Sequence, residues 1–138
     1  ADCSLVVLCG KNEKLYAQLE PYQSERLTVV GFTSQIPLFM SAADVYLTKP
    51  GGLMTTEAIA KRLPMVFVDA VPGCETRNFE FLTSRGVGLG AKNWKQAISM
   101  TVGLLEKEAQ SVQIKEAMRA FLTGVATEQI CRYILKRG

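Results

Sequence analysis

The sequence predicts an α/β fold, a doubly wound parallel sheet contained in a single domain over residues 1–138. Short apolar runs recur at intervals of roughly 20 residues, each followed by a turn and a helical pattern, and this order is typical of parallel βα units. The 138 residues, 48% apolar and 21% charged, are enough for one domain with its own core. We expect βα units over residues 1–90 and packing helices over 93–138.

The first βα unit begins almost at the start of the chain. Residues 5–9 form a continuous apolar run, as in a strand buried on both faces of a parallel sheet. A turn at 10–14 and a helix at 15–20 follow, and Pro21 ends that helix. Because an interior strand rarely begins a domain, we expect preceding sequence to be missing from this chain.

Two further βα units follow. A strand is expected at 27–32, and a helix opens near Pro37 and runs to residue 43. A third strand at 45–47 leads into a turn at 48–52, and a helix follows from about 54 to 62. The other turns of the chain are arranged around this last unit.

The turn at 48–52 has the features of a phosphate site. Pro50 fixes φ and lacks a donor, while Gly51 and Gly52 let the backbone turn tightly beside a bound group. The following helix exposes unpaired N–H groups and the positive end of its dipole. We expect the hydroxyls of Thr55 and Thr56 beside these groups, in a site suited to phosphate.

Two charged residues extend this hypothesis to a nucleotide. Lys49 adds a positive charge next to the turn. Glu57, about one turn into the helix, is placed to accept hydrogen bonds from vicinal hydroxyls such as those of a ribose. The same residues also fit a plain βα turn in which Thr and Glu only cap the helix, because short glycine motifs are weak by themselves.

The next unit contains a second Pro-Gly turn. A strand is expected at 65–69, the turn at 70–78, a helix from Asn78 to about 85 closed by Gly86, and a short strand at 87–90. The carboxyl ends of parallel strands meet at one edge of a sheet. We therefore expect several segments to converge there: Gly10, Phe32, residues 49–55 and residues 73–78.

Three helices are expected after Asn93, at 94–108, 112–122 and 127–136. Apolar residues recur in them every three or four positions, which predicts helices that pack on the sheet. The expected packing residues are Ile98, Val102, Leu105, Ile114, Met118, Phe121, Leu122, Ile130 and Ile134.

Composition narrows the classes of function. The chain has no histidine, and its four cysteines form no C-x-x-C pair, which disfavours a zinc site and indicates reduced thiols in a cytoplasmic protein. No apolar run is long enough to cross a bilayer. A net charge of +3 is too small to indicate a nucleic-acid partner. The basic residues near the C-terminus fit either solvated helix faces or attraction to an anionic membrane surface: Lys115, Arg119, Arg132, Lys136 and Arg137.

The motifs together resemble a known family. They are CGKNEKL at 9–15, VGF at 30–32, MSAAD at 40–44, LTKPGG at 47–52 with Glu57 and Ala58, LP at 63–64, and PGCE at 72–75 with Asn78 and Gly86. In order and spacing, up to about Gly90, they resemble the C-terminal domain of the diacylglycerol glycosyltransferases. This is the monogalactosyldiacylglycerol synthase and processive diacylglycerol glucosyltransferase group, related to the peptidoglycan lipid-linked N-acetylglucosaminyltransferase.

The resemblance implies the Rossmann-like C-terminal half of a GT-B enzyme that binds a nucleotide-sugar donor, UDP-glucose or UDP-galactose. It places Phe32 or its neighbours at the uracil, although from the sequence the ring of Phe32 also fits a core or hinge contact. It places the N–H groups of Gly51, Gly52, Met54 and Thr55 at the diphosphate, Glu57 at the ribose, and Glu75 and Asn78 at the hexose. Lys49 would face either the phosphate or the acceptor. Cys74 departs from the family, where a glutamine often stands, so the resemblance assigns no sugar contact there.

The resemblance also implies an inverting hexosyltransferase whose acceptor is a lipid such as diacylglycerol. The acceptor site and the catalytic base would belong to an N-terminal domain that this chain lacks, so no catalytic residue is assigned here and the fragment alone is expected to be inactive. No Asp-x-Asp metal motif is present, and no cofactor beyond the donor is implied. The enzyme would be cytoplasmic or peripheral at the inner face of the membrane.

Two alternatives remain open. One is a UDP-sugar 2-epimerase, which the combination of TKPGG and PGxE disfavours. The other is a non-catalytic nucleotide-binding module, which the polar residues Glu57, Glu75 and Asn78 disfavour. Which sugar is transferred and which lipid accepts it lie outside what the sequence shows.

Overall fold

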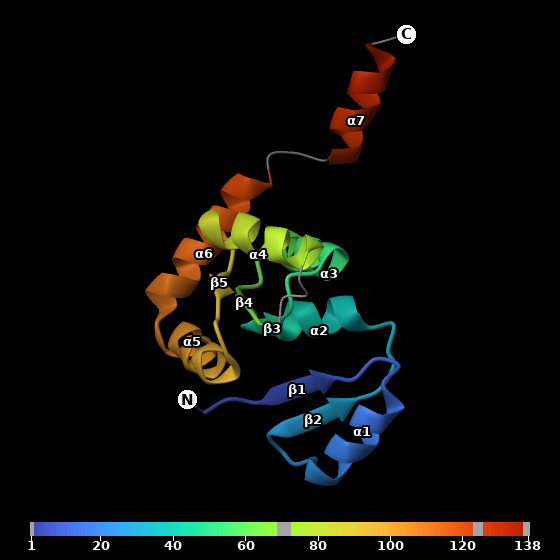
Figure 1. The fold of residues 1–138 in the computed structure, drawn as a ribbon, viewed down its shortest axis with the longest axis vertical. Coiled ribbons are helices and arrows are strands. Elements are labelled where there is room, and N and C mark those ends of the chain that lie inside the picture. The colour runs from blue at the N-terminus through green and yellow to red at the C-terminus, as the bar shows by residue number, and fades with distance from the viewer. Residues whose placement is uncertain (1, 69–72, 123–125, 137–138) are drawn as a thin grey trace. The chain divides into compact units, whose positions relative to one another are not determined.

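The computed structural model describes residues 2–68, 73–122 and 126–136, and it confirms an α/β protein with parallel strands (Figure 1). The chain divides into two compact units, Ala1–Phe39 and Met40–Gly138. The described strands form two parallel sheets, one with the order β1-β2 and one with the order β3-β4-β5. Each unit therefore contains its own sheet.

The first unit is a small parallel βαβ arrangement. Strand β1 (Leu5–Leu8) pairs with β2 (Leu27–Val30), with Leu5 opposite Leu27. Helix α1 (Glu13–Leu19) connects them, and it begins two residues earlier than predicted because Asn12 caps it by accepting the N–H of Leu15 at 3.0 Å. Pro21 lies in a 3-10 turn (η1, Glu20–Tyr22) that ends the helix, as predicted.

Strand β1 is more exposed than its sequence predicts. Leu5 and Val6 are 56% and 42% exposed, so the expected burial on both faces is wrong. In the described residues β1 has one strand neighbour, β2, and pairing on one side covers too little of an apolar strand to bury it. Val29 on β2 is the buried member of this pair of strands.

The second unit contains the main core. Strand β4 (Met65–Phe67) lies between β3 (Tyr46–Thr48) and β5 (Leu89–Gly90), and all three are parallel. The three residues of β4 are fully buried, which confirms the prediction for this apolar run. Their neighbours in the core include Ala58, Val87, Ala97 and Met118, each fully buried.

The helices that follow the strands begin earlier than predicted. Helix α2 (Ile36–Ala42) is close to its expected position, but α3 (Gly52–Ala60) begins two residues early. Helix α4 (Cys74–Ser84) begins four residues before Asn78, and Gly86, at φ +69°, closes it as predicted. The expected strand end at Asp69 and the turn residues 70–72 lie outside the described residues.

Three C-terminal helices are confirmed: α5 (Trp94–Glu106), α6 (Glu108–Phe121) and α7 (Ala126–Leu135). Ile114 and Met118 of α6 are buried as predicted. On α5 the buried residues are Ala97 and Leu104, one position before the expected stripe, so the helix is rotated by one residue relative to the prediction. Contrary to expectation, five predicted packing residues are exposed: Ile98, Leu105, Leu122, Ile130 and Ile134.

Candidate functional site

The turn after β3 presents free backbone donors. The N–H of Gly51 donates to the carbonyl of Lys49 at 2.8 Å, across the buried Pro50, and this closes the turn. Gly51 then caps α3 in an extended conformation with no side-chain cap. Within the described chain no hydrogen bond is found for the N–H groups of Gly52 and Met54, or for that of Leu53 between them.

One expectation about this turn changes. The N–H of Gly51 donates to Lys49, so the N–H groups without a partner in the described chain begin at Gly52 and include Leu53, which the sequence did not single out. The hydroxyls of Thr55 and Thr56 donate to the carbonyls of Gly51 and Gly52, in the first turn of α3. The role that the resemblance gives to the N–H of Thr55 remains a prediction.

A second helix terminus joins this turn. Helix α4 begins after Gly73, whose φ of +105° turns the chain sharply, and it carries Glu75 in its first turn. The ammonium of Lys49 lies 3.0 Å from Glu75 Oε1, and Asn78 Nδ2 donates to the carbonyl of Pro50 at 3.1 Å. The predicted convergence of these two turns is confirmed.

The convergence follows from the sheet. Strands β3 and β4 are parallel neighbours, so the segments that leave their carboxyl ends begin at the same edge. The two contacts then fix the N-terminal turns of α3 and α4 together. The roles that the resemblance gives to Gly52, Met54, Glu75 and Asn78 remain predictions.

The charges at this edge are unequally exposed. The side chain of Glu75 is only 12% exposed, while that of Lys49 is 59% exposed. Lys49 therefore balances a nearly buried carboxylate and still reaches solvent. Glu57 is exposed on α3, and among the described residues no partner is found for its carboxylate.

The first unit contains the other predicted contact, Phe32. Its ring is 71% exposed and lies beside a hollow of ≈ 470 Å³ at the carboxyl ends of β1 and β2. The ammonium of Lys11, which the sequence reasoning missed, lies 5.5 Å from the ring centroid. Lys11 directly follows Gly10 at the carboxyl end of the first strand, and this position could have identified it from the sequence. The convergence of Gly10 and Phe32 with the turn after β3 remains a prediction.

One ionisable group near Phe32 is perturbed. The hydroxyl of Tyr16, which lines the same hollow, donates to Glu20 Oε1 at 3.2 Å. This hydrogen bond, together with the charge of Glu20, raises the pKa of Tyr16 above its ordinary value. Tyr16 is therefore a hydrogen-bond donor at neutral pH, and its proton is directed to Glu20.

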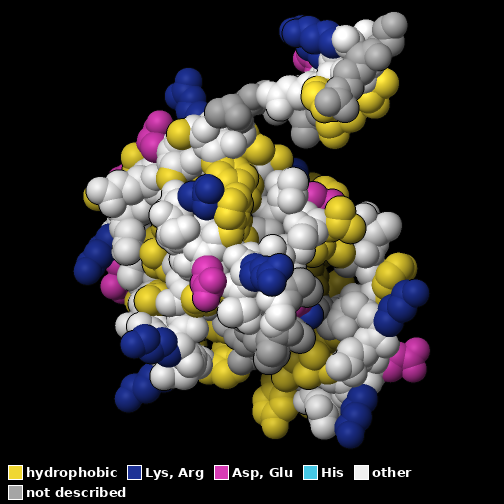
Figure 2. Space-filling view, turned by 45° about the horizontal axis from the view of Figure 1, so that its top comes forward, with side chains coloured by type: hydrophobic (Ala, Val, Ile, Leu, Met, Phe, Trp, Pro, Cys, Tyr) yellow, Lys and Arg dark blue, Asp and Glu magenta, His cyan; other side chains and the backbone are white. Residues whose placement is uncertain are grey.

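The surface charges are dispersed on the face shown in Figure 2, where Lys and Arg side chains lie separately among neutral and apolar ones. The described residues contain no cluster of three potential metal ligands. Within the same ranges, no helix combines the length and apolar character needed to span a membrane.

Comparison with known proteins supports the resemblance. The chain is 29% identical over 136 residues to the processive diacylglycerol beta-glucosyltransferase of Staphylococcus carnosus (strain TM300), covering 97% of this chain and 35% of that enzyme. It is 29% identical over 137 residues to the enzyme of the same name in Staphylococcus aureus (strain Newman), covering 98% and 35%. The chain thus spans 35% of the length of these relatives. No family model matches it.

Among solved structures, the chain is similar to spinosyn forosaminyltransferase SpnP. The TM-score is 0.69 at 13% identity, over 99% of this chain and 44% of that one. This likeness shows the fold alone, a Rossmann-like α/β arrangement of the GT-B kind. The resemblance to the diacylglycerol glycosyltransferases is confirmed.

Proposed function

We propose that this chain is the donor-binding part of an inverting, UDP-sugar-dependent glycosyltransferase that transfers a hexose to a lipid such as diacylglycerol. The observation that carries the proposal is the joining of two helix N-termini at one sheet edge, through Lys49–Glu75 and Asn78–Pro50. The relatives are named as diacylglycerol glucosyltransferases, which supports a lipid acceptor. The acceptor site and catalytic base belong, in this proposal, to another part of the protein.

The N-terminus of α3 would bind the donor diphosphate. The N–H groups of Gly52, Leu53 and Met54 supply hydrogen-bond donors, and the helix dipole and Lys49 supply positive charge. During transfer the acceptor oxygen forms a bond to the anomeric carbon as the bond from that carbon to the diphosphate oxygen breaks. Negative charge then grows on UDP, and each well-placed donor lowers such a barrier by about 3 kcal/mol.

The N-terminus of α4 would position the hexose. The amide of Asn78 donates to Pro50, so its Oδ1 points elsewhere and can accept a sugar hydroxyl. Glu75, held by Lys49, supplies a carboxylate at the same edge. In this proposal Glu57 binds the ribose and Phe32 contacts the uracil.

Donor binding is the direct test. Titrating the isotope-labelled chain with UDP, UDP-glucose and UDP-galactose should shift the amide signals of Gly52, Leu53 and Met54. An absence of shifts there would contradict a diphosphate site at α3. Mixing the full-length protein with diacylglycerol and each donor should then yield a glycolipid, whereas an epimerised nucleotide sugar would favour the 2-epimerase alternative.

The ribose assignment has its own test. Replacing Glu57 with Ala in the full-length enzyme should weaken donor binding by roughly 1–3 kcal/mol, because a carboxylate that pairs with two hydroxyls in the complex is lost. Glu116, exposed on α6, provides the matched control, and Glu116→Ala should leave donor affinity unchanged. Equal affinity in wild type and Glu57→Ala, measured by calorimetry, would refute the ribose role.

A further inference from the structure

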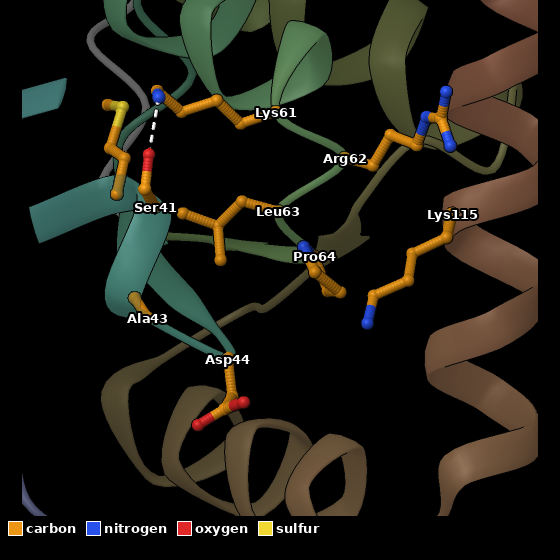
Figure 3. Close-up of a pocket in the computed structure, with 9 residues that line it drawn as sticks. Ser41, Ala43, Asp44, Lys61, Arg62, Leu63, Pro64 and Lys115 are labelled. Atoms are coloured by element: carbon orange, nitrogen blue, oxygen red, sulfur yellow. Dashed lines mark hydrogen bonds between the residues drawn. The ribbon is translucent and has the colours of Figure 1, made fainter. Parts of the chain in front are cut away.

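A second hollow lies at the opposite edge of the β3-β4-β5 sheet (Figure 3). Asp44 precedes β3 and Pro64 precedes β4, so this hollow is at the amino ends of the strands, whereas Lys49 follows β3. Its volume is ≈ 390 Å³. We call it the basic hollow, and it is lined by Met40, Ser41, Ala43, Asp44, Lys61, Arg62, Leu63, Pro64 and Lys115.

Positive charge predominates around this hollow. Three of the lining residues are cationic, and Asp44 is the single acidic one. In the part of the chain that is described, Arg62 and Lys115 have no ion-pair partner. Lys61 donates to the hydroxyl of Ser41 at 2.5 Å, and Figure 3 shows Lys115 reaching from α6 toward Pro64. Within the described residues, neither Arg62 nor Lys115 therefore forms an ion pair with a carboxylate.

The floor of the hollow is apolar. Met40, Leu63 and Pro64 are buried beneath the charged rim. The three cations themselves are exposed, so their attraction for an anion weakens as salt is added. The hollow thus combines an apolar floor with exposed cations at its rim.

The backbone of Arg62 is an independent observation. Its φ is +53°, in the left-handed region that disfavours residues with a Cβ. It occupies the position after the cap of α3, where the N–H of Arg62 bonds to Ile59 at 3.0 Å and the N–H of Leu63 bonds to Ala58 at 2.9 Å. Glycine is the usual residue at this place in such a motif. An arginine therefore occupies a position where glycine would cause less backbone strain. Such strain suggests that the guanidinium of Arg62 has a function.

We propose that the basic hollow binds a phosphate group, carried either by inorganic phosphate or by an anionic phospholipid headgroup, at a site separate from the donor diphosphate. The planar guanidinium of Arg62 can donate two parallel hydrogen bonds to phosphate oxygens. Lys61 and Lys115 are the other two cations of the lining, and Figure 3 shows the ammonium of Lys61 turned to Ser41 and that of Lys115 directed toward Pro64. Asp44 reduces the positive charge of the rim without cancelling it.

Phosphate titration tests the site. Adding inorganic phosphate to the labelled chain at low ionic strength should shift the amides of Ser41, Arg62 and Leu63. Arg62→Gly and Lys115→Gln should each weaken this binding by about tenfold, the usual loss for one charged hydrogen bond. Lys95→Gln, which removes an exposed lysine on α5 away from the hollow, should leave the affinity unchanged.

Arg62→Gly also separates binding from folding. Glycine relieves the left-handed strain, so this variant should melt at a higher temperature than wild type while it loses phosphate binding. A loss of binding in a more stable protein cannot be attributed to unfolding. Phosphate affinity equal to wild type in both Arg62→Gly and Lys115→Gln would overturn the proposal.

Vesicles distinguish the two sources of phosphate. Sedimentation with phosphatidylcholine vesicles, with and without phosphatidylglycerol, should show binding to the anionic vesicles that both variants reduce if the headgroup is the ligand. Phosphate shifts at the hollow without such vesicle binding would assign the site to free phosphate. If neither phosphate nor anionic vesicles respond to the two substitutions, the basic hollow is not an anion site.

Discussion

Asn78 provides a sharp test of how the candidate site is held together. Its side-chain amide donates to the carbonyl of Pro50 at 3.1 Å, and both groups are partly buried. Removal of the amide in Asn78→Ala leaves that carbonyl without its donor. The cost of a lost hydrogen bond at such a position is about 1–2 kcal/mol in the free energy of unfolding. That corresponds to a fall of roughly 3–7 °C in melting temperature for a chain of this size.

The same substitution should affect donor binding. Pro50 lies in the turn that leads to the N–H groups of Gly52 and Met54, so loosening its carbonyl lets these donors move away from the diphosphate. We expect Asn78→Ala to weaken UDP binding by about 1 kcal/mol through this effect alone, because UDP carries no hexose for the Asn78 side chain to contact. Calorimetric titration with UDP measures the affinity, and urea unfolding measures the stability.

A matched control separates the two effects. Asn93 caps α5 by accepting the N–H of Gln96 at 2.9 Å, and Asn93→Ala should cost about 1 kcal/mol of stability through loss of this cap. Because α5 does not contribute to the candidate site, UDP affinity should be unchanged in Asn93→Ala. If both variants lose similar stability and both keep wild-type UDP affinity, the reasoning about Asn78 is refuted.

Two further predictions concern the same unit. Gly90→Ala should lower the free energy of unfolding by about 1–3 kcal/mol, because an added Cβ would lie 2.3 Å from Cζ of Phe79. Urea unfolding measures this loss. A stability equal to that of wild type would show that the Phe79 ring moves aside freely. A double-mutant cycle on Lys49 and Glu75 should give a coupling energy of about 1 kcal/mol that falls as salt is added, since Lys49 is largely exposed. A coupling insensitive to salt would mean that the pair is shielded from solvent.

The apolar runs of the sequence predicted where the strands lie but not how deeply each strand is buried. Residues 65–68 and 5–8 look alike as continuous apolar runs, yet β4 is fully buried, whereas two of the four residues of β1 are exposed and the other two are partly buried. The difference lies in the neighbours: β4 has a strand on both sides, and β1 pairs with β2 alone in the described residues. Pairing partners are a tertiary property, which a local pattern does not contain.

The position of the candidate site was predicted from the order of the strands, but its side-chain contacts were not. The parallel order of β3 and β4 was enough to bring the turn after β3 next to the start of α4, and Asn78 confirms it. The helix starts were missed because Gly52 and the residues before Asn78 were interpreted as turn, although both segments are helical. The pairing of Lys49 with Glu75 depends on side-chain directions across two elements, which spacing alone does not show.

Helix α3 connects both proposed anion sites, and its dipole affects them in opposite ways. Nine residues at about 1.5 Å each make a helix of roughly 13 Å, with its positive end at the donor site and its negative end beside Arg62. Lys61 and Arg62 therefore have a second role available, which is to stabilise the C-terminus of the helix.

The two roles of Arg62 predict different stabilities for Arg62→Gly. A cation at an exposed helix C-terminus contributes about 0.3–1 kcal/mol, whereas a left-handed conformation costs a residue with a Cβ roughly 1–2 kcal/mol. The backbone strain outweighs the attraction to the dipole, so glycine should stabilise the fold even though the helix loses its cation. A lower melting temperature in Arg62→Gly would mean that the attraction to the helix dipole outweighs the backbone strain. The arginine would then have a structural role. A higher one means that the side chain costs the fold stability, which is the expected pattern for a residue that serves a ligand.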